Sequence, residues 1–417
     1  MKYLILGASV AGINAAKTLR KLDKDGSITI ISIDDKVYSR CMLHLYIGKK
    51  RSIDRLSFVE EYFFEKNNIN WIKGRRATKI EPEKKRVVLD DGSFHEYDKL
   101  LIATGSSAVV PPVENLREGK NVFTLRNLED AIAIDKLADG SERAVIIGGG
   151  LIGIDVAVEL MDRGLKVDIV EMGPNILPMQ LDKRSANVYE RELKKRGAGI
   201  FTNVLAQKGV LDSNGNIVEV VLKDGTSLSA DMVIVAAGVR ANADFIEGTN
   251  IKFDRGIVVN ERCETDEEDI YAAGDVCANK PGIWPLAVEE GITAAYNMAG
   301  LEEKIENSFG FKNSMSFYGI PTISIGNPNI DDEDYQIDIY DDGKVYKKVV
   351  HKDGIIYGAI FQRDISYAGV FTKIIAEKIP IDTIDKNIFK IGYGDFFNIN
   401  SKGEFEFTKR EYGLKII

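Results

Sequence analysis

Cysteine is scarce in this sequence, which has three in 417 residues: Cys41, Cys263 and Cys277. So few exclude a disulfide framework, and their spacing matches no metal-ligand pattern, so no metal site is expected. An excess of basic charge is missing too, because 55 basic residues face 64 acidic ones and the net charge is −9. This balance argues against nucleic acid as the main partner, since phosphate binding needs a basic surface.

Long apolar runs are also absent. The longest are too short to span a bilayer, so no membrane partner is expected. The N-terminus begins directly with a strand-like pattern, so we expect no signal peptide, and a cytoplasmic location is the default prediction. A chain of 417 residues suits two or three domains with sizeable cores.

Two copies of a glycine-rich, phosphate-binding pattern stand out among the residues that are present. The first runs from Lys2 to Gly12, and the second runs from Arg143 to Gly153. Each follows an apolar run typical of a buried parallel strand and opens a helix-like stretch. Glycines at these turns allow a pyrophosphate to approach the helix N-terminus closely. The key positions are Gly7, Ser9 and Gly12 in the first copy and Gly148, Gly150 and Gly153 in the second.

Both copies belong to larger repeats. Asp91-Gly92 and Asp224-Gly225 lie between alternating apolar runs, as hairpins require. Each repeat then closes with a buried-strand run that ends in glycine, Gly105 in the first and Gly238 in the second. The sequence therefore predicts an α/β fold with two Rossmann-like dinucleotide-binding domains.

Five motifs in order resemble the pyridine nucleotide-disulfide oxidoreductase superfamily over roughly residues 1–305. They are the two glycine turns, Ala103-Thr104-Gly105, Ala237-Gly238 and Gly274-Asp275. The resemblance implies a fold of the glutathione reductase type, with FAD at the first turn and NAD(P)H at the second. It also implies that Asp275 is a carboxylate on the FAD side, although a helix N-cap before Val276 is the alternative.

The same resemblance implies three domains. A discontinuous FAD-binding domain would comprise residues 1–110 and 240–305, and an NAD-binding domain residues 111–239. Residues 306–417 would form a small α+β domain, because short alternating strands at 335–340, 344–350 and 355–361 precede a helix at 367–378. This layout resembles the C-terminal domain of rubredoxin reductases and of nitrite reductase flavin domains, which favours electron transfer to a protein.

The acid expected to bind the adenosine ribose is clear in the NAD half and ambiguous in the FAD half. Glu171 ends the second strand of the NAD half, where an acid binds the adenosine ribose, and no arginine follows it closely. We therefore expect NADH rather than NADPH. In the FAD half the usual acid falls at Ser32, so Asp34 or Asp35 takes that role or is a turn residue.

The segment 37–47 combines two family patterns. Tyr38-x-Arg40-x-x-Leu43 resembles NADH:rubredoxin reductases, in which the tyrosine and arginine line the FAD site. Tyr-Ser-x-Cys41 resembles the single-cysteine NADH oxidases, NADH peroxidases and coenzyme A-disulfide reductases, in which the cysteine faces the flavin. Cys41 is then either a redox thiol, with a thiolate stabilised by Arg40, His44 or a helix start, or a small buried residue. No Cys-x-x-x-x-Cys pair is present, which excludes a dithiol mechanism.

Two further side chains are candidate catalytic residues. His44 near a flavin can deliver protons close to pH 7, or it can simply pack. Asp155 occupies a position where the family commonly has a glutamate near the nicotinamide and the flavin. The run Lys49-Lys50-Arg51 with Arg55 is the one basic candidate for docking an acidic ferredoxin, or it is a solvated face.

The resemblance implies an FAD-dependent NADH oxidoreductase. Hydride would pass from NADH to FAD, and electrons would then pass to a small iron–sulfur protein of the rubredoxin or ferredoxin type. The alternative is a single-cysteine enzyme that reduces a small oxidant through Cys41, and a minor one is a non-enzymatic flavoprotein that senses NADH. The related groups include monomers and dimers, so the oligomeric state stays open.

Overall fold

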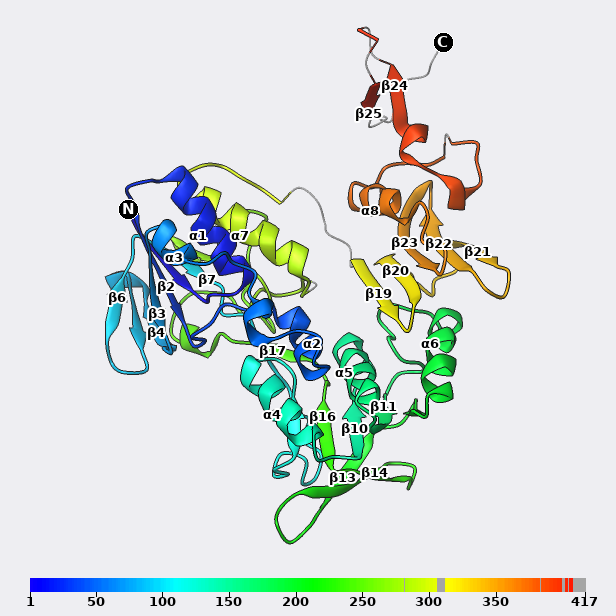
Figure 1. Cartoon of the computed structure of the whole chain (residues 1–417). Coiled ribbons are helices and arrows are strands. Elements are labelled where there is room, and N and C mark those ends of the chain that lie inside the picture. Colours follow the sequence, from blue (N-terminus) through cyan, green and yellow to red (C-terminus); the bar gives the residue numbers. More distant parts are fainter. Residues whose placement is uncertain (281, 306–311, 383, 400–401, 404, 408–417) are drawn as a thin grey trace. The chain divides into compact units, whose positions relative to one another are not determined.

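The computed structural model describes residues 1–417 apart from 281, 306–311, 383, 400–401, 404 and 408–417 (Figure 1). It separates into two compact units, each described by itself below. The first comprises Met1–Gly148, Asp155–Val167 and Ala206–Glu306, and the second comprises Gly149–Ile154, Asp168–Leu205 and Asn307–Ile417. The domain boundaries given above stay a prediction, and 306–311, where the third domain would begin, lie outside the described residues. Across the described chain, no helix has the length and apolarity needed to cross a membrane.

A five-stranded parallel sheet forms the core of the first unit. Its strands lie in the order β18 (Ile270–Ala272), β7 (Lys99–Ile102), β1 (Lys2–Leu6), β2 (Ser27–Ser32) and β3 (Ile69–Lys73). The chain starts at β1, moves outward to β3 and returns on the other side of β1 as β7. The strand order therefore reverses between β1 and β7, the place where doubly wound sheets bind ligands at the carboxyl ends of their strands.

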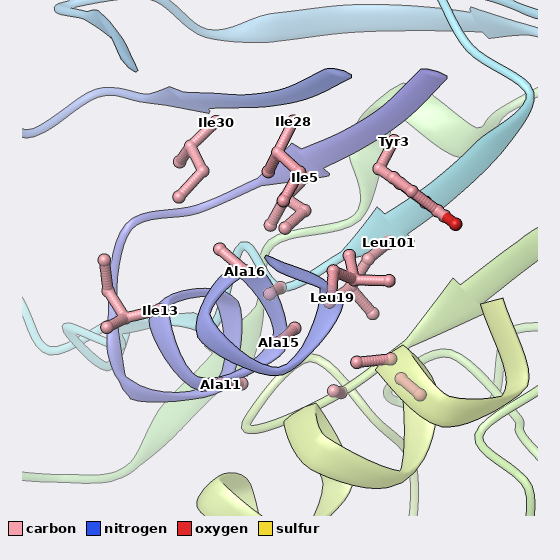
Figure 2. Packing of buried hydrophobic residues seen from close by; sticks show 14 of the residues in the cluster. Tyr3, Ile5, Ala11, Ile13, Ala15, Ala16, Leu19, Ile28, Ile30 and Leu101 are labelled. Atoms are coloured by element: carbon pink, nitrogen blue, oxygen red, sulfur yellow. The ribbon is translucent and has the colours of Figure 1, made fainter. Parts of the chain in front are cut away.

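Two helices pack together against this sheet, α1 (Val10–Leu22) and α7 (Trp284–Met298). Figure 2 shows the small side chains of α1, including Ala11, Ala15 and Ala16, beneath strand residues such as Ile5 and Ile28. The two helix backbones come very close, because a Cβ atom added at Gly291 would lie 2.3 Å from the carbonyl oxygen of Ala11. The alanines and Gly291 therefore fix α7 directly on α1.

The rest of the first unit is built from short sheets and helices. The strands β4 (Ala77–Glu81), β5 (Arg86–Leu89) and β6 (Phe94–Glu96) are antiparallel, as are β13 (Ala206–Leu211), β14 (Ile217–Leu222) and β15 (Ser227–Ser229). The Asp91-Gly92 and Asp224-Gly225 turns join neighbouring strands here, which confirms both predicted hairpins. The strand β8 (Ser106–Ala108) pairs antiparallel with β17 (Val239–Ala241). The strand β16 (Met232–Val235) lies between β9 (Val122–Thr124) and β10 (Arg143–Ile147) and is parallel to both. The helices are α2 (Leu43–Ile47), α3 (Phe63–Lys66) and α4 (Leu128–Ala138), while α5 (Leu151–Asp162) contributes residues to both units.

The second unit contains the C-terminal antiparallel sheet. Its order is β19 (Lys312–Phe317), β20 (Ile320–Gly326), β23 (Ile355–Gln362), β22 (Tyr346–Lys352) and β21 (Gln336–Asp341), and α8 (Ala368–Ala376) packs on it. The strands and the helix predicted from the alternation of residues 335–378 are thus confirmed. The unit also holds α6 (Lys183–Lys195), the pairing of β11 (Lys166–Val170) with β12 (Gly199–Phe201), and the hairpin of β24 (Phe397–Ile399) with β25 (Phe405–Phe407).

Buried hydrogen bonds join α6 to the C-terminal sheet. The hydroxyl of Tyr189 lies 2.6 Å from the carbonyl oxygen of Ile320 and 2.7 Å from Oγ1 of Thr322. Nε2 of Gln362 donates to the carbonyl oxygen of Ser185 at 3.0 Å. All of these groups lie inside the second unit, so residues 185–189 and the sheet form one packed body.

Candidate active site

A cavity of about 480 Å³ opens in the first unit at the carboxyl ends of β1 and β7. Its volume lies in the range of small-molecule and cofactor sites. Segments distant in sequence contribute its wall, among them the first glycine turn, the Ala103–Gly105 turn and the Gly274-Asp275 pair. The structure thus brings together the FAD-side motifs that the sequence places far apart.

The first glycine turn leaves no room for side chains. Gly7 has φ +117°, and a Cβ atom there would lie 2.1 Å from the carbonyl oxygen of Ala103. A Cβ atom at Gly12 would lie 2.0 Å from the carbonyl oxygen of Gly7. Ser9 precedes α1 and makes no capping hydrogen bond through its side chain within the described residues. The N–H groups of the first helical turn therefore remain for an anion in the cavity.

Asp275 faces the cavity and is held by a cation. Its Oδ2 atom lies 2.7 Å from Nη2 of Arg126, and Arg126 also donates to Oγ of Ser106 at 2.9 Å. The next helix, α7, begins only at Trp284, so the alternative in which Asp275 caps a helix at Val276 is wrong. Arg126 belongs to none of the sequence motifs.

A second charged network lines the wall beside β2. Oδ2 of Asp34 lies 2.6 Å from Nη2 of Arg40, and the hydroxyl of Tyr38 donates to Oδ1 of Asp34 at 2.9 Å. Arg40 also donates to Oδ1 of Asn127 at 2.6 Å. Asp34 lines the cavity, whereas Asp35 is exposed outside it, so the structure separates the two candidate carboxylates.

Cys41 lies on the cavity wall, open to the cavity yet surrounded by protein atoms. Burial raises the pKa of its thiol, and the nearby carboxylates of Asp275 and Asp155 raise it further, while Arg126 opposes them. A protonated thiol is the favoured form in this environment. The sequence interpretation in which Arg40 or His44 stabilises a thiolate therefore lacks support in the geometry.

His44 and Asp155 lie side by side, with 3.8 Å between Nδ1 and Oδ2. Burial and the positive charge of Lys50 lower the pKa of His44 to about 4. Burial and the negative charge of Glu159 raise the pKa of Asp155 to about 7. The expectation that His44 titrates near neutrality is therefore wrong, because the imidazole is desolvated, and Asp155 is the group that titrates there.

The basic run at the end of α2 is engaged by acids. Nζ of Lys49 lies 2.6 Å from Oδ1 of Asp135, and Nζ of Lys50 lies 2.8 Å from Oε2 of Glu159, whose side chain is 5% exposed. Arg163 also pairs with Asp135, at 2.8 Å. Lys49 and Lys50 therefore join α2 to α4 and α5, whereas Arg51 and Arg55 are exposed, and the docking role of the run stays a prediction.

The second glycine turn, like the first, has no room for a side chain at its first glycine. Within the first unit, a Cβ atom at Gly148 would lie 2.3 Å from the carbonyl oxygen of Ala236. At Gly150 it would meet open space instead, which leaves room for a ligand. Gly153 lies in the first turn of α5, and a side chain at Gly238, where φ is +106°, would also point into open space.

Glu171 accepts hydrogen bonds from the part of this turn that belongs to the second unit. Oε2 accepts the N–H of Gly149 at 2.7 Å and Oε1 accepts that of Gly173 at 2.6 Å. The side chain is buried, with 7% of the residue exposed, whereas Met172 is 72% exposed. The predicted ribose carboxylate is thus held against the glycine turn by two backbone donors.

Sequence reasoning gave Lys50 only as part of a docking run and not as the partner of Glu159. It missed Arg126, Glu159 and Asn242, whose carbonyl oxygen accepts the hydroxyl of Thr104 at 2.7 Å. None of them stands in a local motif, because each acts on a partner that is distant in sequence. No group of three or more metal-ligating side chains occurs in the part of the chain that the structure describes.

Comparisons with known proteins identify the family to which this fold belongs. Residues 1–291 match the family model described as pyridine nucleotide-disulphide oxidoreductase, so the chain belongs to this family. Members use FAD and NAD(P)H, and the chain is an FAD-dependent pyridine nucleotide oxidoreductase.

Three relatives illustrate the range of the family. The chain is 36% identical to the NADH-rubredoxin oxidoreductase of Clostridium acetobutylicum over 72% of its own length and 75% of that protein. A crystal structure of that reductase covers 92% of this chain and 97% of its own, with a TM-score of 0.76. The NADH oxidase of Methanocaldococcus jannaschii is 32% identical over 73% of this chain and 71% of that protein. The epsilon subunit of the NADH-dependent phenylglyoxylate dehydrogenase of Aromatoleum evansii is 28% identical over 91% of this chain and 92% of that protein.

Two Bacillus subtilis relatives are longer, and the chain spans about half of each, 48%.

Proposed function

We propose that the cavity of the first unit binds FAD. The pyrophosphate would lie over Gly7, Ser9 and Gly12 at the start of α1, and Asp275 would face the ribityl chain. The absence of space for a Cβ atom at Gly7 and Gly12, together with the N–H groups left at the start of α1, supports this assignment. The turns at Ala103, Thr104, Gly105 and Gly238 would leave room for the rings. Arg40 and Asp34, paired on the wall, would orient the adenosine side.

NADH is the proposed electron donor, bound at Gly148, Gly150, Gly153 and Glu171. The buried carboxylate of Glu171 suits the two hydroxyls of an adenosine ribose. A 2′-phosphate would meet this negative charge, and Met172-Gly173-Pro174 supplies no cation to offset it. Discrimination against NADPH is therefore expected.

Electron transfer to a small iron–sulfur protein of the rubredoxin or ferredoxin type is the proposed reaction. FAD, when bound, supplies the ring that accepts hydride and releases electrons singly. The observation that carries this proposal is the state of Cys41, which lies on the cavity wall with its thiol pKa raised by burial, Asp275 and Asp155. A protonated thiol is a poor nucleophile and favours a route without a cysteine intermediate.

Asp155 is the proposed proton acceptor of this reaction. Oxidation of NADH by a one-electron acceptor releases two electrons and one proton per nucleotide, and a base must take up that proton. The carboxylate of Asp155, with a pKa of about 7, is matched to this task near neutral pH. His44, uncharged above about pH 4, would lie beside this carboxyl group without competing for the proton.

A single-cysteine reaction with a small oxidant is the second candidate, because Cys41 does line the cavity and one relative is named NADH oxidase. Turnover assays with NADH and either rubredoxin, oxygen, peroxide or coenzyme A disulfide separate the two candidates. We expect rubredoxin reduction to survive in Cys41→Ser and in the control Cys263→Ala, which changes a cysteine buried in the sheet core. Turnover with oxygen, peroxide or coenzyme A disulfide that exceeds rubredoxin reduction and is lost in Cys41→Ser alone would favour the second candidate.

A further inference from the structure

Glu290 lies inside α7 and its carboxylate is buried, with 1% of the residue exposed. Its Oε2 atom accepts the N–H of Gly274 at 2.7 Å, and its Oε1 atom lies 2.7 Å from Nζ of Lys280. Burial alone would lower the pKa of Lys280, but the charge of Glu290 and its hydrogen bond outweigh burial and raise it. The buried carboxylate of Glu290 is therefore paired with a partly buried lysine.

This pair lies directly behind the cavity. Gly274 precedes Asp275, the carboxylate on the cavity wall, and Lys280 lies in the loop between Asp275 and the start of α7. One side chain, Glu290, therefore holds both the beginning and the middle of this loop. Trp284, the first residue of α7, also lines the cavity, so the cavity wall includes both ends of this loop, Gly274-Asp275 and Gly282 to Trp284.

The position of Glu290 is itself fixed. The next residue, Gly291, lies against the backbone of Ala11, where an added Cβ atom would come within 2.3 Å of the carbonyl oxygen. Ala11 belongs to the glycine turn and its helix, and it also lines the cavity. Glu290 thus connects the Gly274-Asp275 turn to α1, the helix that presents N–H groups to the cavity.

We propose that the Lys280–Glu290 ion pair is a positioning element for FAD: it holds the Gly274 turn so that Asp275 faces the cofactor. Both atoms of the carboxylate are needed, since one holds the turn and the other holds Lys280. Removing either partner leaves a buried charge uncompensated, and the loop is expected to move to relieve it. This inference rests on the proposed FAD site.

The test is the affinity of the FAD-free full-length protein for FAD, measured by quenching of FAD fluorescence, with folded fraction checked by circular dichroism. Lys280→Met is the main variant, and Lys99→Met is its matched control. Lys99 is similarly buried, 22% exposed against 26% for Lys280, and likewise pairs with an aspartate, Asp269 at 2.5 Å, but it lies at the amino end of β7, away from the cavity. Lys280→Arg is the conservative variant, and Glu290→Gln repeats the test if Lys280→Met does not fold.

We expect Lys280→Met or Glu290→Gln to raise the FAD Kd about tenfold or more at equal folded fraction, a change of about 1.4 kcal/mol. Lys99→Met should leave the Kd within about twofold, and Lys280→Arg should restore most of the affinity. Unchanged FAD affinity in both pair variants, alongside a loss in Asp275→Asn, would overturn the positioning role while keeping the site. If Asp275→Asn also bound FAD normally, the assignment of the cavity would fail instead, and the inference with it.

Discussion

Nδ1 of His44 lies 3.8 Å from Oδ2 of Asp155. In this pair the pKa of the histidine lies below that of the aspartate, the reverse of the order in exposed side chains. Burial and Lys50 lower the pKa of the imidazole to about 4, and burial and Glu159 raise that of the carboxyl to about 7. At neutral pH the histidine is uncharged and the aspartate is half protonated. The uncharged imidazole therefore lies beside a carboxyl group that can take up a proton near neutral pH.

Asp155 makes the stability of the FAD-free protein depend on pH. Its folded pKa of about 7 lies above the ordinary value of 3.8, so the folded state holds this proton more tightly. The associated stabilisation is complete below about pH 4 and is lost as the pH rises through 7. Thermal unfolding should show Asp155→Asn gaining stability over the parent between pH 5 and pH 8, by up to about 4 kcal/mol. Parallel curves for the two proteins would contradict the raised pKa.

His44 should titrate well below the usual range for histidine. Because its folded pKa is lowered to about 4, its contribution to stability is present above pH 6.5 and is lost as the pH falls towards 4. The chain has three histidines, so proton NMR can follow each ring, and His44→Gln identifies the signal. A midpoint near pH 4 is expected, and a midpoint above about pH 6 would show a solvated imidazole.

Glu171→Gln should weaken discrimination between the nucleotides. The amide keeps an oxygen for one backbone N–H but loses the charge that attracts ribose hydroxyls and repels a 2′-phosphate. We expect kcat/KM for NADH to fall about tenfold and the NADPH/NADH ratio of kcat/KM to rise. Steady-state kinetics with both nucleotides provide the check, and Glu192→Gln on α6 is a control outside the turn. An unchanged ratio would remove Glu171 from the specificity site.

Tyr189→Phe should destabilise the second unit. Burial raises the pKa of Tyr189 to about 12, so its hydroxyl stays protonated and bonded to Ile320 and Thr322. Deleting it leaves the carbonyl oxygen of Ile320 and the hydroxyl of Thr322 without this buried partner and should cost roughly 1–3 kcal/mol. Tyr340→Phe removes an exposed hydroxyl that lies 3.2 Å from Oδ2 of Asp342, and should change stability by less than about 0.5 kcal/mol. Equal urea midpoints for the two variants would show that α6 does not depend on this contact.

Most elements of the fold can be predicted from local sequence patterns. The glycine turns, both Asp-Gly hairpins and the C-terminal strands are specified by neighbouring residues, so the sequence predicts them. The pairs that shape the site are different: Arg126 with Asp275 and Lys280 with Glu290 join residues that no short pattern connects. The ionisation of His44 likewise depends on burial and on Lys50, which only the folded chain defines.

The most direct test of the central claim, that FAD is the sole redox group, is an anaerobic reductive titration that counts electron pairs per FAD. Uptake of one pair is expected in the parent and in Cys41→Ser, because the raised pKa of Cys41 keeps its thiol protonated and outside the reaction. Uptake of a second pair by the parent, absent in Cys41→Ser, would contradict the claim and establish a cysteine redox centre.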